Sequence, residues 1–405
     1  MSRLPRVPDP ADGVWDPRTV SEPGARPDRR PYVVVAGGGT VGHVAPGVAI
    51  AEALVARGCP REAVLFVGSA RGVEATRVPA AGFEVVLLPG RGIRRRLTVD
   101  NVGAVIGLAL AFLRAAALLV RRRPAVVLAL GGYASVPCVV AAALLRVPIV
   151  VAEQNAVPGA ANRVAGRFAR ACAVSFPATP LPRAVLTGNP VRPDVVAVDR
   201  SDAGRAAARE RLGIGAGRRL VLAYGGSLGA RTVNRAVWEA LACWADRTDL
   251  AVRHAVGDRG WEERPASVSA PTDDDGLQYQ PVRYEEDMPT ALAAADLVVA
   301  RAGASTIAEL AAAGVPSVLV PLPTAAADHQ RVNAEVFAAA GAAVVCSDAD
   351  LDGARLVELV DGLLTDEADL RRRGAAARSF ARPDAAERVA ELVVVHAARP
   401  VPGWS

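Results

Sequence analysis

The stretch with the clearest chemical meaning is residues 295–333, ADLVVARAGASTIAELAAAGVPSVLVPLPTAAADHQRVN. Its short apolar run at 297–300 is typical of a buried parallel strand. Ser305 and Thr306 then offer side-chain oxygens as N-caps for a helix that Gly314 terminates. Free backbone N–H groups and the helix dipole at such a start favour an anion, most often a phosphate. The sequence therefore predicts a phosphate site where this helix begins.

Glu309 lies one turn inside this predicted helix. One interpretation is structural, because Thr306 and Glu309 have the spacing of a capping box. The other is functional: the carboxylate accepts hydrogen bonds from the ribose hydroxyls of a nucleotide whose diphosphate rests on the helix start. The spacing alone does not choose between them.

A second glycine-rich turn lies near the N-terminus. A predicted strand at 32–36 is followed by GGGTVGH at 37–43, and a helix is predicted over 46–57. Strand, glycine turn and helix in this order cradle phosphates in nucleotide-binding folds, although this turn does not match GxGxxG. His43 closes the turn. A lone histidine near a helix start is more often structural, but imidazole titrates near neutral pH and also suits a general base acting on a hydroxyl.

The elements that position these residues alternate between strands and helices along both halves of the chain. Further strands are predicted at 64–67, 84–88, 126–130, 149–152, 171–175, 220–224, 252–256 and 317–322. Glycine turns follow strands at 131–135 and 225–231, and the polar residues Glu153, Gln154 and Asn155 follow another. Ligands of open α/β sheets bind at these strand ends. We therefore predict an α/β protein with two facing Rossmann-like domains and a ligand cleft between them.

Composition and element order divide the chain into four parts. Residues 1–30 are rich in Pro, Asp, Arg and Gly and lack the apolar core of a signal peptide, so we expect a disordered extension of a cytosolic protein. Residues 31–189 and 190–378 are the two predicted domains. Residues 379–405 contain a predicted helix that we expect to pack back on the N-terminal domain.

Composition also argues against several classes of function. The chain has 405 residues, enough for two domains, and its net charge of +5 is too modest to indicate nucleic-acid binding. Every residue counted as Lys or Arg is arginine. The five cysteines include no CxxC pair and are expected to be buried free thiols in a reducing compartment. The four histidines form no HExxH motif, so we predict no protein-held metal.

A long apolar run at 102–120 is flanked by arginines on both sides, Arg94, Arg95 and Arg96 before it and Arg121, Arg122 and Arg123 after it. Its length would suit a membrane span. The predicted strands on either side of it belong to one sheet, however, and a spanning helix would separate them. It is therefore expected to be partly a buried crossover helix and partly an apolar surface, ringed by arginine, that contacts an anionic leaflet.

Six blocks of the sequence together resemble the MurG family, the bacterial transferases that add N-acetylglucosamine to lipid I to make lipid II. These blocks are GGTVGH at 38–43, GGYAS, EQNAVPGAANR, GNPVR, GGSLGAR and ARAGASTIAEL. They occur in the order found in the family, and the resemblance runs from about Tyr32 to about Ala397. Each block alone is weak, whereas six in order are specific.

The resemblance implies a GT-B glycosyltransferase of peptidoglycan biosynthesis, and hence of cell shape and division, that inverts the sugar and needs neither metal nor cofactor. It would bind UDP-GlcNAc as a substrate in the C-terminal domain and a lipid-linked acceptor in the N-terminal domain, at the cytoplasmic face of the cell membrane. The implied donor site comprises Asn155, Arg192, Ser227, Ala304, Ser305, Thr306, Ile307, Ala308, Glu309 and Gln330.

The same resemblance implies roles for individual residues. Glu309 would hold the ribose, Gln330 would contact sugar hydroxyls, and the amides at 304–306 would stabilise the departing diphosphate. His43 would be the base that activates the acceptor hydroxyl. The loop formed by Gly39, Thr40, Val41 and Gly42 would face the acceptor diphosphate.

Three positions depart from the family pattern. Val41 stands where the family loop usually has glycine, Leu228 where it usually has glutamine, and Ala152 where it usually has histidine. One alternative is therefore a MurG-like paralogue with another lipid-linked or specialised-metabolite acceptor. A UDP-GlcNAc 2-epimerase would have no use for the arginine-flanked apolar run, and a catalytically silent scaffold would not need both His43 and Glu309.

Overall fold

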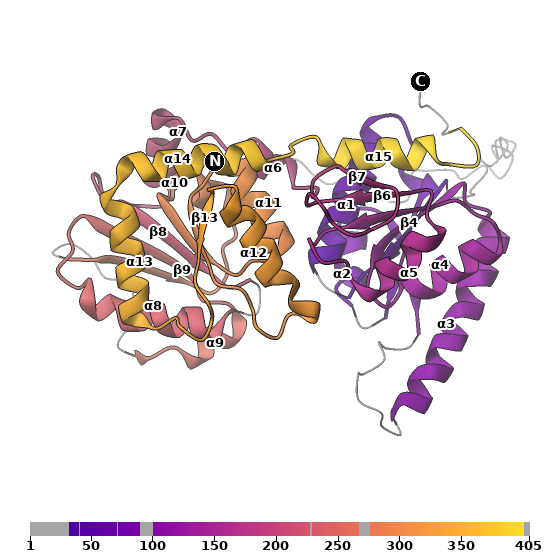
Figure 1. Ribbon diagram of the computed structural model, residues 1–405, viewed down its shortest axis with the longest axis horizontal. Coiled ribbons are helices and arrows are strands. Elements are labelled where there is room, and N and C mark those ends of the chain that lie inside the picture. Colours follow the sequence, from indigo (N-terminus) through magenta and orange to yellow (C-terminus); the bar gives the residue numbers. More distant parts are fainter. Residues whose placement is uncertain are drawn as a thin grey trace, which may run out of the picture.

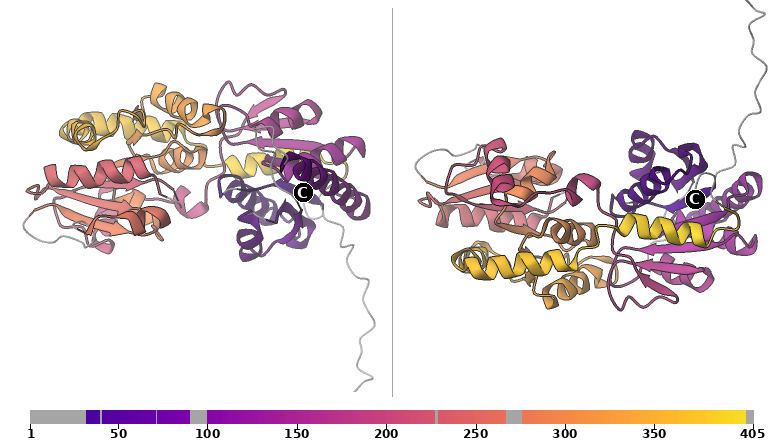
Figure 2. Two further views of the ribbon diagram at one scale, coloured as in Figure 1. Left: turned by 90° about the horizontal axis from the view of Figure 1, so that it is seen from below. Right: turned by 90° about the horizontal axis from the view of Figure 1, so that it is seen from above.

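The chain folds into two α/β domains that lie side by side, as the computed structural model shows (Figure 1). The structure describes residues 32–39, 41–70, 72–89, 100–226, 229–266 and 276–400, with only the backbone described at Val41 and at 100–106. Each domain is built on one parallel sheet, and helices cover both faces of each sheet (Figures 1 and 2).

The N-terminal domain has a seven-stranded sheet in the order β3-β2-β1-β4-β5-β6-β7. Its strands are β1 (Val33–Gly37), β2 (Val64–Ser69), β3 (Glu84–Leu88), β4 (Val126–Gly131), β5 (Ile149–Glu153), β6 (Ala171–Val174) and β7 (Ala184–Leu186). The helices are α1 (Val41–Ala56), α2 (Glu74–Ala80), α3 (Asp100–Arg122), α4 (Ser135–Leu144) and α5 (Ala160–Phe168). The strand order reverses between β1 and β4, which makes the ends of these two strands the expected ligand crevice.

The C-terminal domain repeats this arrangement with six parallel strands in the order β10-β9-β8-β11-β12-β13. Its strands are β8 (Arg219–Tyr224), β9 (Leu250–Ala255), β10 (Gln278–Val282), β11 (Leu297–Ala300), β12 (Ser317–Leu319) and β13 (Ala343–Val345). Its helices are α6 (Pro193–Val196), α7 (Asp202–Arg211), α8 (Arg231–Cys243), α9 (Asp258–Glu263), α10 (Met288–Ala294), α11 (Ala304–Ala313), α12 (His329–Ala339), α13 (Gly353–Thr365) and α14 (Glu367–Phe380). The order reverses here between β8 and β11. The prediction of two Rossmann-like domains is confirmed.

Small apolar side chains fill both cores. Strands β1, β4, β8 and β11 are buried on both faces, so they form nearly continuous runs of Val, Leu and Ala. This pattern made their positions predictable within one residue. Strand β7 was not predicted, because it is only three residues long and its Ala, Val and Leu are exposed or half-buried.

The last helix, α15 (Ala385–Val395), returns to the N-terminal domain, where it packs against α1 (Figure 2). Val389, Ala390 and Val393 are fully buried there and join the core cluster that contains Ile50 and Leu54. Beyond α15, the amide of Ala398 donates a hydrogen bond to the carbonyl of Ala125 at 2.9 Å. The chain therefore crosses between the domains twice, once before α6 and once after α14.

Helix α3 contains the arginine-flanked apolar run and packs against α4 on one side of the N-terminal domain. Ala111, Ala115 and Leu119 are buried in the core under this helix. Leu110, Leu113 and Val120 are exposed. Among the residues that the structure describes, α3 included, no helix combines the length and the hydropathy of a bilayer-spanning segment.

Candidate active site

Four turns that contain glycine lie at the carboxyl ends of central strands in the two sheets. These turns follow β1, β4, β8 and β11, the strands that flank the two points where strand order reverses. Helices α1 and α11, which begin at two of these turns, contact each other across the domain boundary. Helices α1 and α11 therefore meet at the boundary between the two domains.

Helix α11 begins at Ala304, one residue before Ser305, the first of the two predicted N-caps. Its N-cap is Gly303, in an extended conformation, and no side chain caps the helix. Ser305 and Thr306 lie inside the first turn, so the prediction that they act as N-caps was wrong, and no capping box forms with Glu309. Because no side chain occupies the helix start, its first amide groups remain available for an anion. The Ser305 hydroxyl is also buried without a hydrogen-bond partner in the described structure.

Glu309 lies on α11 with Arg192 and Asp194 of the interdomain connection within electrostatic range. Burial raises the pKa of Glu309 to about 7; the positive charge of Arg192 opposes this shift, and the negative charge of Asp194 adds to it. The exposed Arg192 also forms an ion pair with Asp194, with Nη1 and Oδ2 3.5 Å apart. The structure thus brings together Glu309 and Arg192, two predicted donor-site residues from distant parts of the chain.

The side chains of the other predicted donor-site residues differ in their exposure to solvent. The side chain of Ile307 is 1% exposed and lies in the hydrophobic core, so its predicted donor contact would use its backbone. Ala304 is also buried, whereas Ala308 is half-buried. Gln330 lies at the start of α12, and its Oε1 accepts a hydrogen bond from the amide of Leu322 at 3.0 Å. Ser227 and Leu228 lie outside the described residues.

His43 lies in the first turn of α1, which begins at Val41, five residues before the predicted start. Pro46, where the prediction began the helix, is an interior residue, although it has no N–H to donate to the carbonyl of Gly42. Gly39 and Gly42 are exposed near the cleft, and Thr40 lies outside the described residues. The predicted acceptor loop is therefore shorter than expected, and half of it is the start of a helix.

Burial lowers the pKa of His43 below its usual value. Glu153 and Glu74 oppose this shift with their negative charges, and His329 at the start of α12 adds to it. The imidazole is thus held in its neutral form near pH 7, the form that can accept a proton. His329 belongs to the other domain, so its effect on the pKa of His43 indicates that the imidazole lies near the domain boundary.

The buried carboxylate of Glu153 shapes the loop after β5. It accepts hydrogen bonds from the amides of Asn155 at 2.9 Å and Gly159 at 3.0 Å, and from Nδ2 of Asn162 at 2.9 Å. A Cβ atom added at Gly131 would lie 3.2 Å from Nδ2 of Asn162 and 3.4 Å from Nε2 of His43. Asn162 and His43 therefore meet at the glycine turn that follows β4.

A second buried carboxylate, Glu74 of α2, supports the glycine turn after β1. It accepts hydrogen bonds from the amides of Gly39 at 2.9 Å and Ser69 at 2.6 Å. A Cβ atom at Gly38 would lie only 2.2 Å from this carboxylate, so the turn requires glycine there. Sequence reasoning missed Glu74, because a lone glutamate on a short helix carries no motif.

Asn333 of α12 joins the two domains at the base of the cleft. Its Nδ2 donates to Oδ1 of Asn155 at 3.1 Å and to the carbonyl of Ala302 at 3.3 Å, and its Oδ1 accepts from the amide of Ala156 at 2.8 Å. Nearby, the ring of Phe380 packs between those of Phe176 and Phe337. The role of Asn333 was also missed, although the residue lies within the stretch 295–333.

The predicted membrane-facing arginines fall into three groups. Arg94, Arg95 and Arg96 lie outside the described residues, and Arg121 and Arg123 are exposed. Arg122 forms an ion pair with Glu84 at 2.6 Å, so a carboxylate of the protein partly offsets its charge. In the described ranges, no cluster of three His, Cys, Asp or Glu residues has the geometry of a metal site.

Comparisons with known proteins agree with this geometry. Residues 33–174 match the glycosyltransferase family 28 N-terminal domain, and residues 220–389 match the C-terminal domain of that family. A UDP-N-acetylglucosamine–N-acetylmuramyl-(pentapeptide) pyrophosphoryl-undecaprenol N-acetylglucosamine transferase from Desulfitobacterium hafniense (strain Y51) is 37% identical over 89% of this chain and 98% of its own length. The transferase of the same name from Nocardioides sp. is 41% identical over 89% of this chain and 97% of its own length. The crystal structure of Acinetobacter baumannii MurG is 29% identical, with a TM-score of 0.71, over 90% of this chain and 99% of that one.

Proposed function

The chain belongs to the MurG family within glycosyltransferase family 28, and on this basis we propose how its residues perform the family's reaction. The protein is a UDP-GlcNAc-dependent transferase that adds N-acetylglucosamine to lipid I and so makes lipid II for peptidoglycan synthesis. The family, the GT-B fold and the reaction predicted from the sequence are confirmed. The observation that carries this function is the identity of 37–41% to such transferases over nearly nine-tenths of the chain.

The start of α11 is proposed to bind the donor diphosphate. The uncapped amides at 304–306 supply hydrogen-bond donors, and the helix dipole adds a favourable potential. Both become more favourable as negative charge develops on the departing UDP, so they lower the barrier and not merely the substrate energy. Glu309, one turn further along, accepts hydrogen bonds from the ribose hydroxyls in its ionised form.

His43 is proposed to act as the general base. A hydroxyl of the acceptor sugar attacks the anomeric carbon of GlcNAc, and the bond from that carbon to the UDP oxygen breaks in the same displacement, which inverts the anomeric configuration. The hydroxyl proton moves to the neutral imidazole, and UDP departs with the bonding electron pair. The lowered pKa of His43 keeps the imidazole unprotonated before the reaction.

The apolar surface formed by α3, α4 and α5 is proposed to contact the inner leaflet of the cytoplasmic membrane. Its exposed side chains include Leu113 (61% exposed), Leu144 (69%) and Phe168 (54%). The helices α3 and α4 pack together, as do α4 and α5, so these side chains belong to adjacent elements. Exposed arginines lie on or beside the same helices, at 114, 121, 123, 146, 163 and 167. Apolar side chains among arginines match the chemistry of an anionic membrane surface.

The defining experiment is transfer of radiolabelled GlcNAc from UDP-GlcNAc to a short-chain lipid I analogue in the presence of a metal chelator. Transfer under these conditions is expected. Binding of UDP-GlcNAc without transfer would instead indicate another acceptor. Release of a free epimer without acceptor would indicate an epimerase, and absence of nucleotide-sugar binding would indicate a silent scaffold.

A further inference from the structure

A cavity in the C-terminal domain lies at the amino-terminal ends of its central strands, away from the proposed donor site. It has a volume of about 680 Å³ and lies where β8 and β11 begin, since Arg219 is the first residue of β8 and Asp296 directly precedes β11. The donor site lies at the other ends of these strands. Helix α11 spans the distance: it begins at the donor site, and Gly314, which ends it, lines the cavity.

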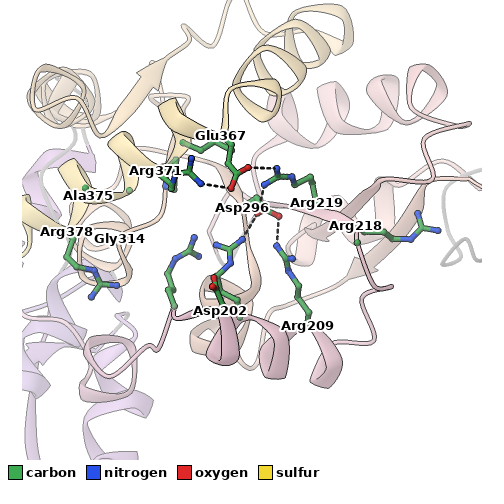
Figure 3. Close-up of a pocket in the computed structure, with 16 residues that line it drawn as sticks. Asp202, Arg209, Arg218, Arg219, Asp296, Gly314, Glu367, Arg371, Ala375 and Arg378 are labelled. Carbon is green, nitrogen blue, oxygen red and sulfur yellow. Dashed lines mark hydrogen bonds and ion pairs between the residues drawn. The ribbon is translucent and has the colours of Figure 1, made fainter.

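We call this the arginine cavity, because arginine is the commonest residue in its lining. Seven arginines and three carboxylates line it, and Figure 3 shows Arg218 pointing away from the others. The remaining six are Arg200, Arg205, Arg209, Arg219, Arg371 and Arg378. Against Asp202, Asp296 and Glu367 they leave three positive charges uncompensated. Such a concentration of guanidinium groups is unfavourable unless an anion is nearby.

The carboxylates are already shared among several arginines. Asp296 is nearly fully buried and accepts hydrogen bonds from Arg205 at 2.5 Å and Arg209 at 2.6 Å, as well as from the amide of Leu220 at 2.7 Å. Glu367 pairs with Arg371 at 2.7 Å and, more distantly, with Arg219 at 3.7 Å (Figure 3). Asp296 also lies 3.6 Å from Arg219, so each of these two carboxylates is already shared between several arginines.

Arg200 and Arg378 have no carboxylate within ion-pair distance in the described part of the chain. Arg200 donates through Nη1 to the carbonyls of Leu292, Ala293 and Ala295, and Arg378 donates through Nη2 to the carbonyl of Ala313 at 2.8 Å. Carbonyl acceptors satisfy N–H groups but leave the net charge in place. Burial lowers the pKa of Arg200 to about 9; the positive charges of Arg205, Arg378 and Arg209 add to this shift, and the negative charge of Asp296 opposes it.

We propose that the arginine cavity binds a small anion that carries two or more phosphate groups, at a site separate from the donor site. The guanidinium fork matches the oxygen atoms of a phosphate in a bidentate geometry, and several forks around one cavity suit several phosphates. The volume is within the range of small-molecule sites. A bound polyphosphate would face Arg200 and Arg378, neither of which forms an ion pair with a carboxylate among the described residues.

Isothermal titration calorimetry of the full chain with inorganic tripolyphosphate tests this proposal. The protein is first saturated with UDP, so that the donor site cannot take up the probe. We expect one tripolyphosphate per chain, with affinity reduced at least fivefold in Arg378→Gln and in Arg371→Gln. Absence of binding to the UDP-saturated protein would overturn the proposal.

Arg235→Gln is the matched control, because Arg371 and Arg235 are both exposed on helices and both pair with a glutamate one turn away. Arg235→Gln is expected to change tripolyphosphate affinity less than twofold. If it lost as much affinity as the cavity variants, the effect would come from the overall positive charge of the protein and not from the arginine cavity. UDP affinity, measured for every variant, verifies folding and tests the donor site independently. If Arg378→Gln does not fold, Arg371→Gln still decides the outcome, since its side chain is 70% exposed.

Discussion

Asn333 and Asn155 are hydrogen-bonded across the two domains, with Nδ2 of Asn333 3.1 Å from Oδ1 of Asn155. Asn333 is fully buried and is also hydrogen-bonded to the carbonyl of Ala302, just before α11, and to the amide of Ala156. One side chain therefore sets the position of the acceptor-side loop relative to the start of α11. A site made from two domains requires such a connection, because small errors in position cost catalysis heavily.

Replacing Asn333 with alanine is expected to impair both stability and donor use. The substitution leaves the buried amide of Ala156 without its acceptor, so the free energy of unfolding should fall by about 2 kcal/mol. The KM for UDP-GlcNAc should rise, because the loop before α11 loses a contact. Denaturant unfolding and initial-rate kinetics measure the two effects. Asn234→Ala is the control, because Asn234 is also buried but is hydrogen-bonded within the C-terminal domain. This variant should be less stable, whereas its KM for UDP-GlcNAc should not change.

The raised pKa of Glu309 predicts a pH dependence of donor use. Its carboxyl is protonated in the free enzyme below about pH 7, and the proposed ribose contact uses the ionised form. The kcat/KM for UDP-GlcNAc should therefore fall as the pH decreases through about 7. Glu309→Gln should have a lower kcat/KM without this decrease. A decrease of the same shape in Glu309→Gln would assign the titration to another group.

The same shift has a consequence for stability. A glutamate with an ordinary pKa when unfolded and a pKa of about 7 when folded binds more protons in the folded state between these values. Its contribution therefore becomes less favourable as the pH rises from about 4.5 to about 7. Glu309→Gln should be more stable than the natural protein at pH 8, and this difference should vanish at pH 4. Thermal unfolding at both pH values measures it.

His43→Ala is expected to lower kcat by a factor of about 10² to 10⁴, the usual effect of losing a general base. The dissociation constant for UDP-GlcNAc should not change, because His43 is not among the proposed donor contacts. Calorimetric binding and single-turnover transfer separate these quantities. His396→Ala, which changes the residue that ends α15, is the control and should retain its activity. Turnover at the natural rate in His43→Ala would show that another group accepts the proton.

Much of this fold was predictable because its central strands are buried on both faces. Apolar runs followed by glycine turns identified β1, β4, β8 and β11, the strands that position the site. The edge strand β10 was missed because it begins with Gln278 and contains Pro281, which an edge strand tolerates but which weakens a strand pattern. The edge strand β3, by contrast, was predicted at 84–88, its observed bounds, because four of its five residues are apolar.

The residues that support the site were harder to predict. His43, Glu309 and Arg192 belong to recognisable blocks; Glu309 and Arg192 lie within electrostatic range, and His43 lies on α1, which contacts the helix of Glu309. Glu74 and Asn333 were missed because their roles depend on contacts with residues 35 and 178 positions away. The start of α11 was mispredicted for a different reason: serine and threonine are common N-caps, but here Gly303 takes that position and leaves the amides uncapped. Helix propensity favours an N-cap side chain that bonds to the first amides of the helix. The proposed phosphate site instead needs those amides free.

Membrane association should depend on the exposed apolar side chains of α3, α4 and α5. Leu113→Gln and Leu144→Gln, combined in one chain, remove apolar surface that is 61% and 69% exposed and should not disturb the core. Cosedimentation with vesicles containing anionic lipid should decrease at least tenfold, while transfer to a water-soluble acceptor analogue is retained. Val395→Gln is the matched control, since Val395 is 68% exposed but lies on α15, and its cosedimentation should not change. Unchanged cosedimentation of the double variant would show that the protein contacts the membrane through another surface.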